Sequence, residues 1–211
     1  IYTGGIAGGL ECVGNHVGIS ASIEFVNCHN SGVINGGETT TSASYYGGLF
    51  GWSTTRGNGT ISKGTLSVEN CSNKGKIEGA MGTSSYTGGI AGEVGCMKLS
   101  DVYFTKVYNS GDIVGGTITD GGYNSYTGGL FGHAASTTET EIFRIQQCWN
   151  TGKITGSGGK SHTGGLMGRG AAVGKEYTVS SCFNSGDIIG GNVDDAYTGG
   201  LVGLFETADS R

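Results

Sequence analysis

The chain has 211 residues, a net charge of −5 and an unusual composition, with 45 glycines, no proline and only 14% charged residues. Glycine without an every-third-residue period excludes collagen, and the lack of a basic cluster argues against nucleic acid as a partner. No stretch approaches 18 consecutive apolar residues, so we expect no helix that spans a membrane. Hydrophobic residues make up 36% of the chain and recur at fixed positions, which favours a packed core over disorder.

The first element of each repeat is a block that reads aromatic-Thr-Gly-Gly-aliphatic-x-Gly. The blocks begin at Tyr2, Tyr45, Tyr86, Tyr126, His162 and Tyr197, and their first glycines are 35 to 43 residues apart. Paired glycines indicate a tight bend or a close approach of two backbones. They lack the strand-to-helix setting of a phosphate-binding loop. Each block therefore predicts a short strand with a bend.

Next in each repeat comes a stretch of variable length, followed by a second predicted strand. The stretch shrinks from Gly9–Ser22 in the first copy to Arg169–Glu176 in the fifth, and we expect it to be a surface loop. The strand shows apolar residues two positions apart, such as Ile23 and Phe25, which is the period of side chains that face one core. A second variable stretch, as in Thr117–Ser125, precedes the next block.

A second block, Cys-x-Asn-x-Gly-x-Ile, closes each repeat and predicts a third strand around its isoleucine. The isoleucine is unchanged in five copies and is expected in the core: Ile34, Ile77, Ile113, Ile154 and Ile188. The asparagine is equally constant, and stacked amides can hydrogen-bond from copy to copy: Asn30, Asn73, Asn109, Asn150 and Asn184. We expect the asparagine, and the glycine two residues later, to adopt the left-handed backbone of a sharp corner.

These elements predict an all-β fold, a parallel β-helix or solenoid of about five coils of 35–43 residues that fills residues 1–211 as one repeat domain. Crossover chirality favours a right-handed coil. The alternative is a β-propeller, although a 35-residue copy is short for a four-stranded blade. Lys76, Asp112, Lys153 and Asp187 alternate in charge at one repeat position, which suits direct neighbours in a stack. Because the first residues already belong to a repeat, we expect the chain to be a fragment of a larger protein.

The cysteines are predicted to be structural. Four occupy the first position of the second block, where Val107 stands in the third copy, so the position favours a small buried apolar group: Cys28, Cys71, Cys148 and Cys182. Disulfides between adjacent coils are the alternative, but parallel side chains would give poor geometry. Cys12 and Cys96 are expected in flexible loops. No close cysteine or histidine pair suits zinc, and we expect no catalytic residue, metal or cofactor.

The best binding candidate is a stripe of tyrosines that recurs once per coil: Tyr2, Tyr45, Tyr86, Tyr126 and Tyr197. Tyrosine combines an apolar face with a polar tip, which suits sugars or protein surfaces. The alternative is that the rings stack on one another and cover the coil edge. His29 and His162 are expected to be surface aromatics, and Tyr126→Ala is expected to leave the fold largely intact.

The Tyr-Thr-Gly-Gly-Leu-x-Gly block, coupled to Asn-x-Gly-x-Ile, resembles the GLUG-type repeat over essentially the whole chain. That repeat occurs in bacterial surface and adhesin-like proteins and in non-catalytic regions of immunoglobulin-A1-cleaving metallopeptidases. The resemblance implies an extracellular or cell-surface scaffold or spacer without enzymatic activity, with a host or neighbouring protein or glycan, or flanking domains of the same chain, as partners. The alternatives are a region that positions substrates for a secreted peptidase and, less favoured, a polysaccharide-active β-helix.

Overall fold

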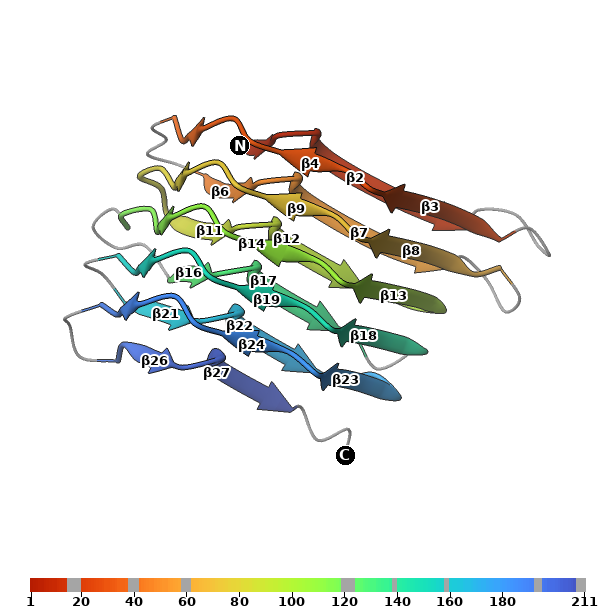
Figure 1. Ribbon diagram of the computed structural model, residues 1–211. Helices are drawn as coiled ribbons and strands as arrows, with labels where there is room; N and C mark the ends of the chain where they lie inside the picture. Colours follow the sequence, from red (N-terminus) through yellow and green to blue (C-terminus); the bar gives the residue numbers. More distant parts are fainter. Residues whose placement is uncertain are drawn as a thin grey trace.

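The computed structural model describes residues 1–14, 20–37, 42–57, 62–118, 124–137, 140–157, 160–191 and 195–207. Every regular element in these ranges is a β-strand, so none is a helix that could cross a membrane. The strands follow the chain around successive coils that lie on top of one another (Figure 1). This arrangement confirms the predicted parallel β-solenoid and rules out the propeller, while the handedness of the coil stays a prediction.

The glycine-rich block of each repeat supplies two strands, one on each side of the paired glycines. The first sheet contains β1 (Tyr2–Gly4), β6 (Ala43–Gly47), β11 (Ser84–Gly88), β16 (Ser125–Gly128), β21 (Ser161–Gly164) and β26 (Tyr197–Gly199). The second sheet contains β2 (Ala7–Gly14), β7 (Phe50–Gly57), β12 (Ala91–Cys96), β17 (Phe131–Ser136), β22 (Met167–Ala172) and β27 (Val202–Thr207). Much of the stretch predicted to be a variable loop after this block is therefore strand.

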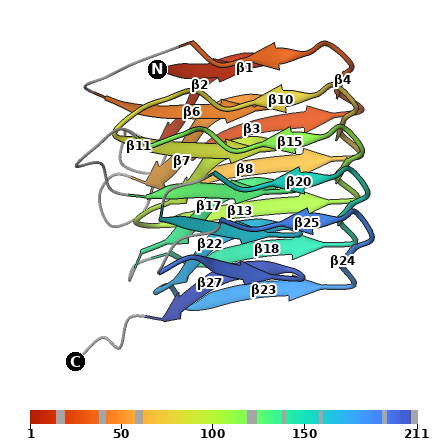
Figure 2. The ribbon, with the colours of Figure 1, turned by 90° about the vertical axis from the view of Figure 1, so that its left-hand side faces the viewer.

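The rest of each repeat supplies three more strands (Figure 2). The third sheet contains β3 (Ala21–Val26), β8 (Gly64–Glu69), β13 (Ser100–Thr105), β18 (Ile142–Gln146) and β23 (Glu176–Ser180). The fourth contains β4 (His29–Asn30), β9 (Ser72–Asn73), β14 (Tyr108–Asn109), β19 (Trp149–Asn150) and β24 (Phe183–Asn184). The fifth contains β5 (Ile34–Asn35), β10 (Ile77–Glu78), β15 (Ile113–Val114), β20 (Ile154–Thr155) and β25 (Ile188–Ile189). The prediction of three strands per coil was wrong, because each coil has five.

Equivalent residues of successive repeats lie directly beside one another in all five sheets. Tyr45 pairs with Tyr86 in the first sheet, and Ile77 pairs with Ile113 in the fifth. All strand pairs are parallel. The columns read from the sequence are therefore real stacks of side chains, and insertions between strands do not shift the register.

The interior contains two apolar clusters. The larger lies between the second and third sheets and includes Phe50, Val68 and Phe104, all fully buried. The smaller joins Tyr46 of the first sheet to the isoleucines of the fifth sheet, of which Ile77, Ile113 and Ile154 are fully buried. The prediction that the alternating apolar residues of the strand before the cysteine and the isoleucines of the second block form the core is therefore confirmed.

A ladder of asparagine side chains lies inside the coil at the fourth sheet. The Nδ2 of each asparagine donates to the Oδ1 of the asparagine in the next coil, at 2.7 Å from Asn30 to Asn73 and at 2.8 Å from Asn73 to Asn109. The same Nδ2 also donates to the carbonyl of the glycine two residues later in its own coil, for example from Asn73 to Gly75 at 2.7 Å. Every copy repeats these bonds up to Asn184, which confirms the predicted ladder.

The ladder explains why the two sequence blocks occur together. The second glycine of each pair faces the asparagine of its own coil: a Cβ on Gly89 would lie 2.4 Å from Asn109 Cγ and 2.2 Å from the Gly129 carbonyl oxygen. Gly48 and Gly129 are in the same situation. Real Cβ atoms do not approach other atoms this closely, so only glycine leaves room for the amide column.

We expect Asn109→Leu to lower the free energy of unfolding by at least about 2 kcal/mol, because it leaves the Asn73 amide hydrogen and the Asn150 oxygen buried without their partner. Urea denaturation followed by circular dichroism measures the change. Asn184→Leu is the matched control. Its side chain is only partly buried, and so it should cost clearly less. Equal losses at both positions would contradict a role for the buried ladder in stability.

The left-handed backbone occurs at a different position from the one predicted. Neither the asparagines nor the Asn-x-Gly glycines adopt it. The residue directly before the cysteine position does so in every copy, with φ between 51° and 56° at Asn27, Asn70, Lys106, Gln147 and Ser181. Residues other than glycine rarely adopt this backbone conformation. The corner between the third and fourth sheets is therefore held by stacking of the coils rather than by local residue preference.

Candidate functional site

The predicted tyrosine stripe exists and runs along the outer face of the first sheet. We call it the tyrosine strip, and it consists of Tyr2, Tyr45, Tyr86, Tyr126, His162 and Tyr197. Over the first three coils the rings are stacked, with centroids 5.0 Å apart for Tyr2 and Tyr45 and 4.6 Å apart for Tyr45 and Tyr86. The faces of stacked rings contact each other, which agrees with the alternative that the rings stack to cover the coil edge. Mainly their edges and hydroxyl groups remain for a partner.

The regular stacking ends at Tyr126. Its ring is tilted by 42° against Tyr86, and it meets His162 edge-on at 66° with centroids 5.1 Å apart. His162 in turn meets Tyr197 at 87°. The half of the strip around Tyr126 and His162 therefore has a different surface chemistry from the half around Tyr45.

A second row of side chains from the second sheet flanks the strip. The flanking row consists of Trp52, Glu93, His133 and Arg169, which lie side by side in adjacent strands. The His133 ring lies 5.6 Å from that of Tyr126, and the Arg169 guanidinium lies 5.7 Å above the same ring. Glu93 is 3.4 Å from His133 Nδ1. Tyr126 is thus enclosed by two histidines and an arginine.

The sequence analysis did not find the flanking row. Each of its members directly follows the last glycine of the first block, so their positions were visible. Their side chains share no chemical type, however, and the stretch that they begin was assigned to a variable loop. The only available signal was the constant spacing from the glycine.

Burial changes the protonation behaviour of this region. The pKa of Tyr45 is raised by desolvation and by the nearby Glu93, and the same two causes raise the pKa of Tyr86 to about 12. Burial, followed by the positive charge of Arg169, lowers the pKa of His162. At neutral pH the phenols of Tyr45 and Tyr86 are therefore protonated and His162 is neutral. Tyr45, Tyr86 and His162 thus present uncharged hydrogen-bonding rings near the charges of Glu93 and Arg169.

The exposure of the strip is uneven. Tyr2 and Tyr197 at its ends are 54% and 47% exposed, whereas Tyr126 and His162 are each only 6% exposed. The Nδ1 atom of His162 and both ring nitrogens of His133 are buried and make no hydrogen bond in the described part of the chain, although Glu93 lies within ion-pair distance of His133 Nδ1. The expectations that His162 is a surface aromatic and that Tyr126 is dispensable for folding were based on an exposed strip, and the structure contradicts that exposure.

We expect Tyr126→Ala to lower the free energy of unfolding by about 3 kcal/mol, because it removes a buried ring that contacts Tyr86, His133 and His162. Tyr2→Ala deletes the same side chain at an exposed place and should cost less than about 1 kcal/mol. Guanidinium denaturation of both variants measures the difference. Equal and small losses would show that the centre of the strip is not packed.

Acid should destabilise the protein through His162. A histidine whose pKa is lowered by folding favours the folded state above its unfolded pKa of about 6.5 and loses that contribution as the pH falls through the folded value. We expect His162→Tyr, which restores the residue of the other copies, to reduce the drop in melting temperature between pH 7.5 and pH 5. A drop identical to that of the parent would exclude His162 as its origin.

The cysteine column is confirmed as a row of free thiols. Cys71 and Cys148 are fully buried, and the Cys148 Sγ accepts the amide N–H of Val107 at 3.4 Å. Its thiol also points to the Gln146 carbonyl at 3.2 Å. Cys12 and Cys96 are buried in β2 and β12, so their placement in flexible loops was wrong.

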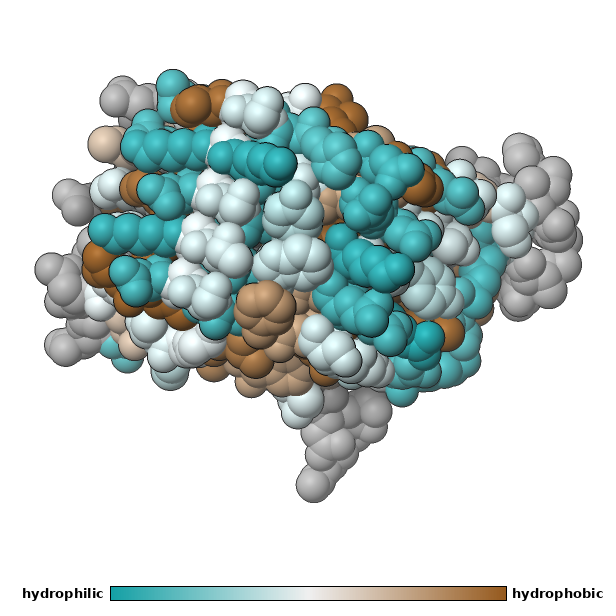
Figure 3. Space-filling view, in the orientation of Figure 1, coloured by the Kyte–Doolittle hydropathy of each residue, from teal (hydrophilic) through white to brown (hydrophobic). Residues whose placement is uncertain are grey.

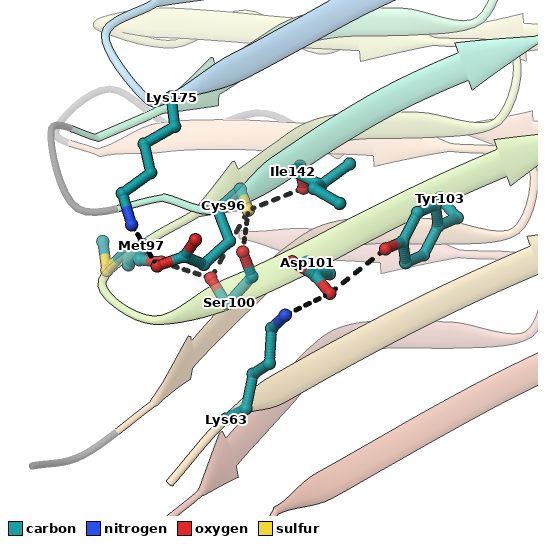
Figure 4. A network of polar contacts seen from close by, with 9 residues as sticks. Lys63, Cys96, Met97, Ser100, Asp101, Tyr103, Ile142 and Lys175 are labelled. Carbon is teal, nitrogen blue, oxygen red and sulfur yellow. Dashed lines mark hydrogen bonds and ion pairs between the residues drawn. The ribbon is translucent and has the colours of Figure 1, made fainter. Parts of the chain in front are cut away.

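A polar network around Cys96 and Asp101 closes the corner between the second and third sheets (Figure 4). Lys63 Nζ lies 2.7 Å from an oxygen of Asp101, to which the Tyr103 hydroxyl also donates at 3.1 Å. Cys96 contacts Ser100 Oγ at 3.4 Å, and burial raises the pKa of its thiol to about 11. A protonated, fully buried thiol is a poor nucleophile. The network is accordingly best explained as a structural corner.

A second aromatic row lies on the outer face of the fourth sheet. The Tyr108 and Trp149 rings are 4.8 Å apart and nearly parallel, and Trp149 and Phe183 are 6.0 Å apart. In the space-filling view this face is mixed, with pale and brown residues along the middle and hydrophilic ones on both sides (Figure 3). The stacked rings cover one another's faces, and Phe183 at the end of the row is 50% exposed.

Within the described ranges no three His, Cys, Asp or Glu residues are grouped to hold a metal ion. No family model, curated protein or solved structure matches the chain. The resemblance to the GLUG-type repeat therefore stays a prediction. Of the surfaces described above, the tyrosine strip with its flanking row is the best candidate for contact with another molecule.

Proposed function

We propose that the chain is a non-enzymatic, extracellular repeat scaffold, an adhesin-like surface or spacer module that presents variable loops. One observation carries the proposal: repeats of 35 to 43 residues keep the same register in all five sheets. The length differences fall between strands, as in the six residues between β2 and β3 against the three between β22 and β23. A body that stays constant while its connections vary suits the presentation of loops.

The partner that fits the tyrosine strip is a glycan or a protein surface. Tyrosine and tryptophan offer apolar contact together with hydrogen bonding, and Arg169 adds a charge beside them. The extracellular setting and the adhesin-like role rest on the GLUG-type resemblance. The same strip would also serve the alternative role of positioning a protein substrate for a peptidase domain.

Binding and turnover assays on the same preparation test the proposal. The purified chain is immobilised and probed with a glycan array and with extracellular matrix proteins, next to a variant in which residues 119–123 between β15 and β16 are replaced by a Gly-Ser linker of equal length. We expect a partner whose binding is reduced in this loop variant or in Trp52→Ala, while both variants keep the parent's unfolding profile.

The turnover arm incubates the chain with a panel of polysaccharides and unfolded proteins. We expect no release of reducing ends and no new amino termini. Turnover that a single substitution abolishes without unfolding the chain would overturn the proposal, and release of reducing ends in particular would favour the polysaccharide-active alternative.

A further inference from the structure

Glu93 of the flanking row is a partly buried carboxylate without a lysine or arginine beside it. Its side chain is 20% exposed and lies in β12, with a neighbouring strand of the second sheet on each side. Among the described residues, the basic group within ion-pair distance of it is His133, whose Nδ1 is 3.4 Å away. An imidazole is not a permanent cation, as a guanidinium is. Glu93 therefore has no permanent counter-charge.

Other carboxylates with similar burial have such a counter-charge. Asp101 lies 2.7 Å from Lys63, and Glu141 lies 2.6 Å from Lys175. Glu24 has no basic partner among the described residues, but its side chain is exposed to water. In the described part of the chain, Glu93 is the carboxylate that is shielded from water and still lacks a lysine or arginine.

Aromatic rings lie around this carboxylate. Trp52 and His133 are its neighbours in the adjacent strands β7 and β17. Tyr45 and Tyr86 are close enough that, after burial, the charge of Glu93 is the next cause that raises the pKa of each phenol. Adjacent strands are about 4.8 Å apart, so a cation above Glu93 would lie within about 6 Å of the rings on both sides, which is the range of cation–π attraction.

Arg169 shows how a guanidinium occupies a comparable position in the same row. Its guanidinium carbon lies 5.7 Å from the centre of the Tyr126 ring, and its Nε donates to the Glu206 carboxylate at 2.9 Å. One side chain thus combines a contact with an aromatic ring and an ion pair with a carboxylate. Trp52 and Glu93 offer the same two components, and no lysine or arginine of the described chain pairs with this carboxylate.

We propose that Glu93, Trp52, Tyr45 and Tyr86 form a binding site for an arginine side chain of a partner protein. The guanidinium donates two parallel hydrogen bonds to the Glu93 carboxylate and stacks against the Trp52 ring. The two tyrosine hydroxyl groups are further acceptors beside it. A neutral sugar would leave the carboxylate without a counter-charge, so the charge of the site favours a protein over a neutral glycan. The inference deepens the proposed contact role of the tyrosine strip and rests on it.

The test uses the two tryptophans of the chain, because Trp52 lies at the site and Trp149 lies in the fourth sheet. The full chain is titrated with the peptide acetyl-Gly-Arg-Gly-amide, and the indole N–H signals are followed by nitrogen-15 NMR. The signal that is lost in Trp52→Phe identifies Trp52. We expect this signal to shift saturably while that of Trp149 stays in place.

Two further peptides test the chemistry of recognition. Citrulline has the shape of arginine without its charge, and the citrulline peptide should bind at least about tenfold more weakly. The lysine peptide carries the charge without the planar fork and should bind several-fold more weakly. Equal binding of either peptide and the arginine peptide would overturn the proposal.

A matched pair of protein variants locates the site. Glu93→Gln keeps the shape of the side chain and removes its charge, so we expect at least about tenfold weaker binding with a melting temperature within a few degrees of the parent. Glu24→Gln removes the same charge at an exposed position of the third sheet and should bind like the parent. Equal binding by Glu93→Gln and the parent, or a shift of the Trp149 signal instead of the Trp52 signal, would overturn the proposal.

Failure of the arginine site and failure of the scaffold function give different results. A protein partner whose binding falls in the loop variant but not in Glu93→Gln would overturn the arginine site and leave the scaffold function intact. Turnover of a substrate would overturn the scaffold function, whereas saturable binding of the arginine peptide that depends on Glu93 would still support the site.

Discussion

Ile113→Asp is expected to abolish cooperative folding of the chain. Ile113 is fully buried in β15 between Ile77 and Ile154, its neighbours in the fifth sheet. A carboxylate there would have no counter-charge, and the penalty for burying it exceeds about 4 kcal/mol, a large part of the stability of a domain. Circular dichroism during heating should show no sharp transition.

Val114→Asp is the matched control. Val114 is the next residue in β15 but is only partly buried, so the same charge can remain in water. We expect a melting temperature within a few degrees of the parent. If Ile113→Asp melts like Val114→Asp, the assignment of the isoleucines to the core is wrong.

Gly89→Ala is expected to be as damaging as the loss of a large core side chain, although it adds only one methyl group. The new Cβ would lie 2.2 Å from the Gly129 carbonyl oxygen and 2.4 Å from Asn109 Cγ. The backbone of the next coil and the asparagine ladder would both have to move. We expect the free energy of unfolding to fall by more than about 3 kcal/mol, measured by chemical denaturation.

The control for this prediction is the same substitution at an open glycine. Gly37→Ala meets no atom within 4 Å and, like Gly89, has no left-handed backbone. It should be neutral or stabilise the chain by up to about 1 kcal/mol through the unfolded state. Similar effects of the two substitutions would argue against close contact between Gly89 and the ladder.

The architecture could be predicted because a stack places identical sequence positions in contact. The isoleucine at Ile77 and Ile113, the asparagine at Asn73 and Asn109 and the cysteine at Cys71 were assigned to the interior from their repetition, and each is buried. The amide ladder followed from the chemistry of asparagine in such a column. Repetition thus carried the long-range information that a single domain sequence lacks.

The sequence analysis missed the features at which the residue type does not repeat from copy to copy or the strand is too short to show a pattern. The strands at Ser72–Asn73 and Ile77–Glu78 have two residues each, too short to show a period of two. The left-handed position holds residues as different as Asn70, Lys106 and Gln147, because stacking enforces its backbone. The flanking row varies for a different reason, since its side chains lie on the outer face.

The asparagine ladder also gives the stack of coils a net dipole along its axis. Every side-chain amide from Asn30 to Asn150 donates toward the coil of higher residue number, so the dipoles of the column add rather than cancel. The first coil thus carries the negative end of this aligned array and the last coil the positive end.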